Sequence, residues 1–413
     1  MAFNAINDRD SDRSLLLVIP PVVLKRGDDI LVDGDFSNNL EAYLREFDMV
    51  TVACPPAADD RDFHRLRLAT ELNGSSKLRI LLLPEPYRED RYVLGKGKVT
   101  RLLSTEIEKA RYLLISPHAP FDWSTLAAEI CIRKNRKYNM EADWNVPYTT
   151  KYIYNKLPFG FSMLRKKIWL RYYIPKYWRC LRNSALSLVK AGDVYTDYRE
   201  IAPNAHPVMN IQISDEERIG RNALEAKVAR ILTGQPIRLV YAGRAIEMKG
   251  PMHWLRTLKR LRDRGIGFEA VWFGTGELSG QMEAYVRAHG LDQSCHLSGR
   301  ATRDEVLAAM RASDVFLFCH MTRESPRCLV EALASAAPLV GFGTDYSRCL
   351  VEECGGGDFV DPGDIAGLTD LIEKYSVDRE ALAKLVREAA ASSKLLDRDS
   401  AIGARIALMK EHL

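Results

Sequence analysis

The chain has 413 residues, of which 46% are hydrophobic and 28% charged, and its formal net charge is +4. This length suits two domains, and this composition is that of a globular chain and excludes a disordered one. The longest apolar run, 15–24, contains two prolines and is shorter than the about 20 residues of a bilayer span, so we expect no membrane span. No secretory leader is expected, and eight scattered cysteines without a CxxC pair predict reduced thiols in the cytoplasm.

The first half of the chain alternates strand-like and helix-like stretches. Apolar, strand-like runs lie at 14–20, 48–55, 77–86 and 110–120. A loop rich in Gly, Asp and Asn is expected at 23–39, and helical spacing follows at 39–47. Strands that alternate with helices predict a parallel sheet covered on both faces.

The second half repeats this alternation more regularly. Strands are predicted at 237–243, 268–274, 295–299, 314–318 and 338–342, and helices at 250–265, 277–290, 303–313, 326–336 and 361–375. This order predicts a doubly wound α/β domain at 209–394, after a first α/β domain at 1–208. The last helical stretch, 395–413, is expected to pack back on the first domain, and a ligand cleft is expected between the two domains.

Two junctions after strands in the second half carry residues suited to anions. "YAGRAIEMKG" places Arg244 and Lys249 beside a helix N-terminus, where cations and backbone N–H groups attract the same negative charge. "FGTGE" holds Gly274 and Gly276, which permit a tight turn and close approach to a ligand. The plainer interpretation is a pair of solvated cations and an ordinary turn.

A third junction, "TRESPRCLVEALASAAPLV" at 322–340, carries two acids. Pro326 suits the first helical position, and the backbone amides of Arg327 and Cys328 follow it. Glu324 and Glu331 lie seven residues apart, about two helical turns, so they share one face. A carboxylate there can accept two sugar hydroxyls, although the stretch taken alone fits a capping acid and a surface acid better.

Together, these junctions resemble the nucleotide-binding domain of glycosyltransferase family 4, the retaining enzymes with the GT-B fold. The family's "GR…KG" loop matches "GRAIEMKG", its "G.G" turn matches "FGTGE", and its "E…P..l.EAla.G.P.V" stretch matches 324–341. The resemblance covers about 237–375. It implies two Rossmann-like doubly wound domains facing a cleft, with 1–208 on the acceptor side and 209–394 binding a nucleotide sugar.

The resemblance also implies roles for individual residues. Arg244 and Lys249 would hold the donor diphosphate, Glu331 would bond the ribose hydroxyls, and Glu324 would contact the transferred sugar. The family's two glutamates usually enclose seven residues, but here they enclose six, so alignment on Pro326 puts Arg323 at the first position. The remaining donor-binding candidates are Gly34, Gly243, Gly274, Gly276, Ser325, Pro326, Arg327 and Cys328.

The first domain offers weaker candidates. Gly34 would belong to the glycine-rich loop after the first strand, and His118, at a strand end, would face the cleft as a catalytic residue or serve a structural role. "VDGD" contains the Asp-x-Asp metal signature of the other glycosyltransferase fold, but the tandem α/β pattern argues against that fold. We therefore expect no cofactor and no metal requirement.

A basic, aromatic segment at 132–183 stands apart from these motifs. Residues 131–182 hold thirteen Lys and Arg, twelve aromatic residues and only two acids. Such a composition suits the headgroup region of an anionic membrane or a lipid-phosphate acceptor. It also fits an ordinary basic face or, less well, a nucleic-acid surface.

The resemblance implies a retaining glycosyltransferase of the hexosyl type. It would move a sugar from a nucleotide-sugar donor, such as a UDP- or GDP-sugar, to a glycan or lipid-linked acceptor in polysaccharide or glycoconjugate biosynthesis. The protein would be cytoplasmic, and the basic segment would bind the inner face of the cytoplasmic membrane; no nucleic-acid partner is expected. The alternative is a non-catalytic nucleotide-sugar-binding or scaffold protein with the same fold.

Overall fold

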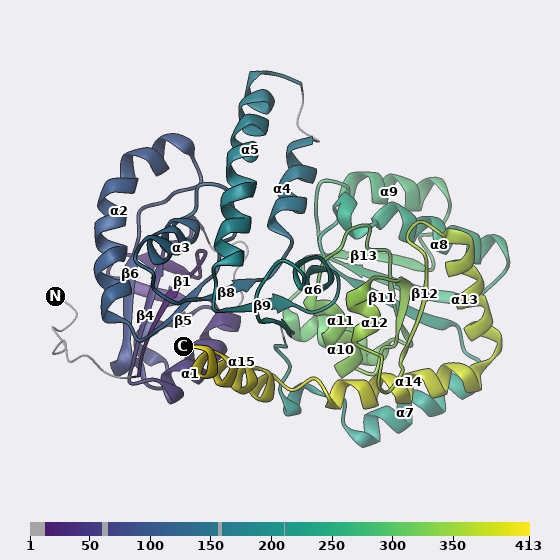
Figure 1. Ribbon diagram of the computed structural model, residues 1–413. Coiled ribbons are helices and arrows are strands. Elements are labelled where there is room, and N and C mark those ends of the chain that lie inside the picture. Colours follow the sequence, from purple (N-terminus) through teal and green to yellow (C-terminus); the bar gives the residue numbers. More distant parts are fainter. Residues whose placement is uncertain (1–12, 60–64, 156–158, 210) are drawn as a thin grey trace. The chain divides into compact units, whose positions relative to one another are not determined.

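The computed structural model describes residues 13–59, 65–155, 159–209 and 211–413. The chain divides into two compact units, both drawn in Figure 1. The first unit takes Met1–Lys190, Val194–Met209 and Asp399–Leu413, and the second takes Ala191–Asp193 and Asn210–Arg398. The sequence placed this division between 208 and 209, and it placed the last helix with the first unit.

The first unit is built on a seven-stranded parallel sheet. Its strands, in spatial order, are β10 (Ala205–Val208), β9 (Leu186–Lys190), β8 (Asn139–Ala142), β7 (Tyr112–Ile115), β1 (Ser14–Val18), β4 (Met49–Cys54) and β6 (Leu78–Leu82). Residues 15–18 of β1 are all at most 1% exposed, because helices cover both faces of the sheet. This burial explains why the strands are continuous apolar runs rather than alternating ones.

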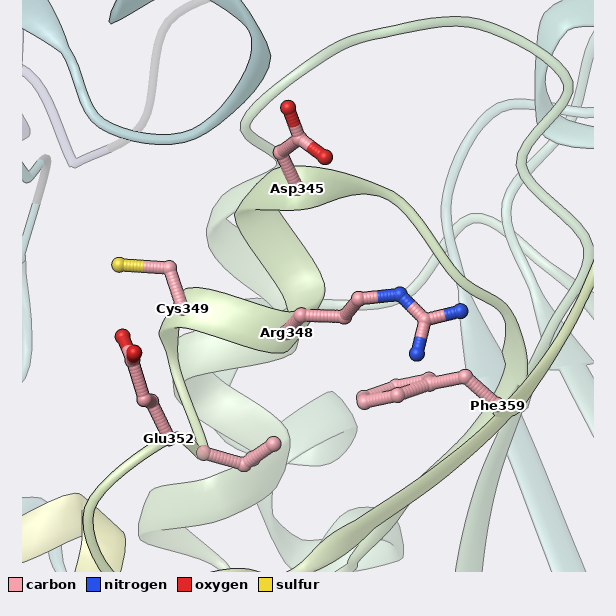
Figure 2. Close-up of a pocket in the computed structure, with 6 residues that line it drawn as sticks. Asp345, Arg348, Cys349, Glu352 and Phe359 are labelled. Carbon is pink, nitrogen blue, oxygen red and sulfur yellow. The ribbon is translucent and has the colours of Figure 1, made fainter. Parts of the chain in front are cut away.

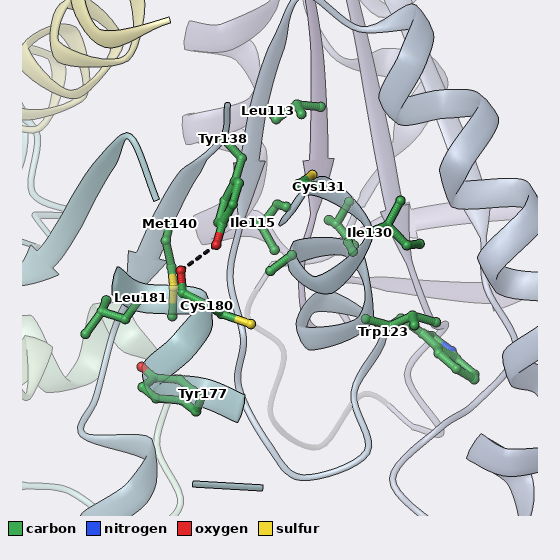
Figure 3. Close-up of a cluster of buried hydrophobic side chains, with 14 of the residues drawn as sticks. Leu113, Ile115, Trp123, Ile130, Cys131, Tyr138, Met140, Tyr177, Cys180 and Leu181 are labelled. Atoms are coloured by element: carbon green, nitrogen blue, oxygen red, sulfur yellow. Dashed lines mark hydrogen bonds between the residues drawn. The ribbon is translucent and has the colours of Figure 1, made fainter. Parts of the chain in front are cut away.

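Helices form a separate core on each face of this sheet. Trp123, Tyr138 and Tyr177 belong to one core, where the Tyr138 hydroxyl donates to the carbonyl of Cys180 (Figure 3). Ile402, Ile406 and Met409 of the C-terminal helix α15 belong to the other, so α15 packs on the first unit. The helices of this unit are α1 (Gly34–Glu46), α2 (Glu89–Lys109), α3 (Trp123–Arg133), α4 (Val146–Asn155), α5 (Phe161–Arg182), α6 (Asp193–Tyr198) and α15 (Arg398–His412).

The prediction of a loop at 23–39 is wrong for most of this segment. Strands β2 (Val23–Arg26) and β3 (Asp29–Val32) form a hairpin that β5 (Arg67–Leu68) extends to a small sheet. The two-residue turn begins at Gly27, whose φ of +61° suits the first position of a type II′ turn. Asp33 then caps α1 by accepting the Phe36 N–H at 3.2 Å, so Gly34 begins a helix instead of lying in a loop. Two short 3-10 turns follow β5, at Ala69–Glu71 and Ser75–Lys77.

The second unit is built on a six-stranded parallel sheet. Its spatial order is β13 (Cys295–Gly299), β12 (Phe268–Phe273), β11 (Ile237–Ala242), β14 (Val315–Phe318), β15 (Leu339–Phe342) and β16 (Gly357–Val360). All five neighbouring pairs are parallel. The carboxyl ends of these strands therefore meet along one edge of the sheet.

Helices cover both faces of the second sheet as well. On one side α8 (Pro251–Asp263) packs against α9 (Ser279–Ala288) and α13 (Ile365–Val377). On the other side α11 (Arg327–Ala334) packs against α10 (Arg303–Ala312) and α14 (Arg379–Lys394), and α14 packs on α7 (Arg221–Leu232) (Figure 1). Short elements are α12 (Asp345–Cys349) and two 3-10 turns at Asp215–Glu217 and Glu247–Lys249. The predicted doubly wound architecture is thus present.

The sequence predicted no membrane span and reduced cysteine thiols. Among the described helices, none combines the length and the apolar composition of a membrane span. All eight cysteines are free.

Candidate functional site

The strand order of the second sheet reverses between β11 and β14. From β11 the chain winds through β12 to β13, then returns to β14 beside β11 and continues outward to β15 and β16. Doubly wound sheets bind ligands at the carboxyl ends of the strands, at such a reversal point. The loops that carry the predicted residues, 243–250 and 319–326, leave from this point.

These two loops pack directly against each other. The Met321 N–H donates to the Met248 carbonyl at 2.8 Å. Gly250 has a φ of +62°, and a Cβ at this position would lie 2.0 Å from the Cys319 carbonyl oxygen. Only glycine therefore allows the approach that brings Lys249 next to the loop after β14.

Lys249 and Glu324 form an ion pair at this place. The Lys249 Nζ donates to Glu324 Oε2 at 2.7 Å, and the Thr322 hydroxyl lies 3.4 Å from Glu324 Oε1. The two charged side chains are only 12% and 23% exposed. The side chain of Arg323 is 56% exposed and lies beside Asp193 instead. The carboxylate that meets the predicted phosphate-binding lysine is thus that of Glu324, although alignment on Pro326 put Arg323 at the glutamate position.

Arg244 lies in the same loop as Lys249. Its side chain is exposed, and none of the described carboxylates pairs with it. Arg244 and Lys249 therefore place two cations in one loop at the reversal point. An anion there would meet both charges together with the backbone N–H groups at the start of α11.

A buried hydrogen bond joins the carboxyl ends of β11 and β14 beneath these two loops. The Tyr241 hydroxyl and His320 Nε2 are 2.8 Å apart, and both side chains are buried. Burial holds the pKa of His320 well below its ordinary value, and the nearby charge of Lys249 lowers it further. A Cβ on Gly243 would lie 2.6 Å from the Tyr241 hydroxyl, so glycine is required here for packing.

Gly274 and Gly276 pack the loop after β12 against the loop after β11. A Cβ on Gly274, whose φ is +115°, would lie 2.2 Å from the Gly243 carbonyl oxygen. A Cβ on Gly276 would lie 2.4 Å from the Ala245 carbonyl oxygen, and Ala245 N–H donates to the Thr275 carbonyl at 3.1 Å. The structure therefore gives these glycines a packing role, and their contact with a ligand stays a prediction.

Helix α11 begins one residue later than expected. Pro326 is its N-cap, with an extended ψ of 133°, and Arg327 is its first residue. Ser325 Oγ lies 3.4 Å from the carbonyl of Ala191, which belongs to the second unit. Burial raises the pKa of the Cys328 thiol to about 12, so this thiol stays protonated. Cys328 can therefore offer an anion its backbone N–H but no thiolate.

Glu331 is held by an arginine that the sequence analysis missed. Arg303 Nε donates to Glu331 Oε1 at 3.1 Å, while the same guanidinium pairs with Glu217 and donates to the Gln212 carbonyl at 3.3 Å. Arg303 is the first residue of α10, and no motif or spacing in the sequence marks it as a partner of Glu331. The two acids of the 322–340 stretch thus bind different cations on different elements.

In the first unit the strand order reverses between β1 and β7, and His118 follows β7. Its ring stacks on Trp144, with centroids 4.7 Å apart, and its backbone N–H donates to Asp122 Oδ2 at 2.6 Å. Desolvation lowers the pKa of His118, which favours the neutral imidazole. Nearby, Lys190 Nζ donates to Asp143 Oδ1 at 2.9 Å, so polar groups gather at the ends of β7, β8 and β9. Gly34, by contrast, lies in the first turn of α1.

An open pocket beside α12 contains none of the predicted residues. Figure 2 shows the Arg348 guanidinium over the Phe359 ring, 5.4 Å from its centroid. The residues that line this pocket are Asp345, Arg348, Cys349, Val351, Glu352 and Phe359. Across the described parts of the chain, no three or more His, Cys, Asp or Glu side chains are grouped to hold a metal ion.

Comparisons with known proteins find chains with a similar sequence and a similar fold. Residues 225–392 match the family model described as glycosyl transferases group 1. The putative glycosyltransferase EpsF of Bacillus subtilis is 31% identical over 121 residues, 29% of this chain and 31% of that protein. The putative colanic acid biosynthesis glycosyltransferase WcaL of Salmonella typhimurium is 23% identical over 231 residues, 53% of this chain and 55% of that protein. The chain thus spans about a third to a half of the curated relatives that it matches.

The fold extends beyond these matches. A crystal structure of HepE from Anabaena, in complex with UDP and glucose, has a TM-score of 0.64 and 15% identity over 97% of this chain and 100% of that chain. This likeness, which covers both units, confirms the predicted GT-B fold. The family match confirms the resemblance to glycosyltransferases that the motifs predicted.

Proposed function

We propose that this chain, with its GT-B fold and its match to glycosyl transferases group 1 over 225–392, is a glycosyltransferase that uses a nucleotide-sugar donor. The observation that carries the proposal is the meeting of Lys249 and Glu324 where the strand order reverses. A cation for the diphosphate and an acid for the sugar lie there side by side. The N-terminus of α11 begins three residues beyond Glu324.

The donor diphosphate would bind the positive side of this site. As the sugar–phosphate bond breaks, negative charge grows on the leaving diphosphate. Arg244 and Lys249 supply full charges, and the backbone N–H groups of Arg327 and Cys328 supply the positive end of a helix dipole. The backbone N–H groups are fixed by the helix before the reaction, and the two side chains turn toward the diphosphate as it binds. We expect them to suffice without a metal.

The ribose of the donor would bind Glu331. Arg303 fixes one carboxylate oxygen of Glu331 at 3.1 Å, and none of the described residues pairs with the other oxygen. Two vicinal hydroxyls can donate to one carboxylate. Arg303 is therefore a positioning residue, which acts through Glu331.

Glu324 would contact the transferred sugar. Lys249 holds the Glu324 carboxylate in place in the unliganded protein. When the lysine turns toward the diphosphate, the carboxylate would be free to accept a sugar hydroxyl. Retention of the anomeric configuration is part of the proposal and follows from the resemblance. The acceptor would then attack from the side on which the diphosphate leaves, and the leaving phosphate oxygen would take its proton. A glycan or lipid-linked acceptor, and a role for His118 in the first unit, complete the proposal.

The proposal is tested by donor binding followed by turnover. Isothermal titration with UDP, GDP and ADP should find one nucleoside diphosphate that binds, and the matching sugar nucleotide should then be hydrolysed or transferred. Arg244→Ala and Glu331→Ala should reduce turnover by about a hundredfold or more. Arg256→Ala is the matched control, because Arg256 is an exposed arginine on α8 away from the strand ends.

A non-catalytic protein with this fold would give a different pattern. It would bind a nucleotide sugar without converting it, so the rates of the wild type and of Glu324→Gln would both equal the uncatalysed background. Binding that is equally strong in the Arg244, Glu331 and Arg256 variants would contradict the site itself.

A further inference from the structure

Helix α5 carries apolar side chains on two opposite faces. The buried face packs in a core of the first unit through Leu170, Tyr173, Tyr177, Cys180 and Leu181. The other face is exposed and consists of Phe161 (81% exposed), Leu164 (54%), Ile168 (52%) and Tyr172 (62%). At about 100° per residue these four lie within about 80° of one another, roughly opposite the buried face. We call these four residues the exposed stripe of α5.

Three of the four stripe residues, Phe161, Leu164 and Ile168, lie in the part of α5 that leaves the core. Leu170 is the first described side chain of α5 that is buried, and Phe159, just before the helix, is 96% exposed. Figure 1 shows this half of α5 beside α4, extending beyond the sheet of the first unit. Trp169, which packs on Phe121 with ring centroids 5.1 Å apart, joins the base of this half to the core.

Positive charge lies along one border of the stripe. Helices α4 and α5 together contain eight Lys and Arg and no Asp or Glu. Arg165 pairs with Glu89 at 3.2 Å and Lys176 with Glu129 at 3.3 Å, so two of these charges are compensated from other helices. Lys167 and Arg171 are exposed along one border of the stripe, and none of the described carboxylates pairs with them.

We infer that the exposed stripe of α5, with its border of cations, docks on the surface of an anionic lipid bilayer. The apolar side chains would enter the boundary between headgroups and acyl chains, as in a helix that lies in the interface plane. Lys167 and Arg171 would stay at the level of the anionic headgroups. Tyr172 at the edge of the stripe suits the same interface, because its ring is apolar and its hydroxyl is polar.

Charge and chemistry favour a bilayer over other occupants. Two copies of this chain that met through the stripe would bring two cationic pairs of α4 and α5 helices together, and like charges repel. A single-stranded nucleic acid would use the cations and the aromatic rings, but the aliphatic Leu164 and Ile168 offer it no stacking face. An anionic bilayer uses both the aliphatic side chains and the cations. The inference does not depend on the proposed function.

Co-sedimentation of the full chain with vesicles tests the inference. The protein should sediment with phosphatidylcholine vesicles that contain phosphatidylglycerol, more at low salt than at high salt, and far less with phosphatidylcholine alone. Leu164→Ser with Ile168→Ser should reduce partitioning by about tenfold or more. Lys167→Gln with Arg171→Gln should reduce it about 25-fold at low salt, because each cation near an anionic surface contributes about fivefold.

The control variant is Arg179→Gln with Arg182→Gln, which makes the same charge change in the last turn of α5. This variant should partition within about twofold of the wild type, and circular dichroism melting should show that all three variants fold. Wild-type protein that stays in the supernatant, or a stripe variant that sediments like the wild type, would overturn the inference. So would a wild-type dimer that the stripe variant converts to a monomer without vesicle binding, or an oligonucleotide complex that the same variant loses.

Discussion

The Lys249–Glu324 ion pair leads to a prediction in which its two partners behave oppositely. If Lys249 binds the donor diphosphate, Glu324 competes for the same ammonium group in the unliganded protein. Glu324→Gln removes the competing charge and should tighten the binding of the nucleoside diphosphate. Lys249→Met removes the phosphate contact and leaves Glu324 unpaired beside the incoming anion, so it should weaken binding.

The structure sets the size of both effects. A charge-assisted hydrogen bond contributes about 1.5–3 kcal/mol when it is buried. The side chains here are 12% and 23% exposed, so solvent screening reduces the competition from Glu324 to about 1 kcal/mol. Glu324→Gln should therefore bind the diphosphate about fivefold more tightly, and Lys249→Met about thirtyfold more weakly, since about 2 kcal/mol is lost.

Turnover should respond differently from binding. Glu324→Gln should lower kcat by about a hundredfold although the diphosphate binds more tightly, because the sugar loses its carboxylate contact. Isothermal titration with the diphosphate and initial rates with the sugar nucleotide measure the two effects separately. A structural salt bridge would instead lower the melting temperature in both variants and leave binding unchanged. Weaker diphosphate binding in Glu324→Gln would refute the reasoning.

Three further predictions concern Arg303, the buried Lys227 and the need for a metal. Arg303→Met should raise the KM for the donor about tenfold and leave kcat within about threefold, because Arg303 acts only through Glu331; an equal loss in kcat would contradict this role. Lys227 is buried and donates to the carbonyls of Met310, Ser335 and Ala336, and burial lowers its pKa to about 7. The unfolded chain therefore binds one more proton between about pH 7 and 10, so the free energy of unfolding in urea should rise with pH over that window, by up to about 1.4 kcal/mol per unit, and Lys227→Met should abolish the rise. Finally, turnover should be unchanged after treatment with EDTA, and a loss that Mg²⁺ or Mn²⁺ restores would show that the diphosphate needs a metal.

The second unit could be predicted well because its local signals agree with each other. Its strands are buried apolar runs, and its helices begin at recognisable residues such as Thr302, which caps α10 in a capping box with Glu305. Gly250 and Gly274 mark places where two backbones approach too closely for a Cβ. These residues fix the loops after β11, β12 and β14, and the motifs in those loops were therefore found from the sequence.

The first unit and the contacts between distant residues were harder to predict. The hairpin of β2 and β3 was taken for a loop because its strands have four residues each and its turn is rich in polar residues. The pairing of Glu331 with Arg303 joins positions 28 residues apart, and no periodic pattern encodes such a contact. Helix α5 has two apolar faces, and the sequence does not say which of them the core covers and which stays exposed. Composition alone predicted the basic, aromatic segment but not its exposed stripe.

The central claim is that the carboxyl ends of β11 and β14 bind the diphosphate of a nucleotide-sugar donor. The most direct measurement is isothermal titration of UDP, GDP and ADP into the wild type, Lys249→Met and the control Arg256→Ala. We predict that one nucleoside diphosphate binds the wild type and Arg256→Ala with similar affinity and binds Lys249→Met about thirtyfold more weakly. Equal affinity in all three proteins, or no binding of any diphosphate to the wild type, would contradict the claim.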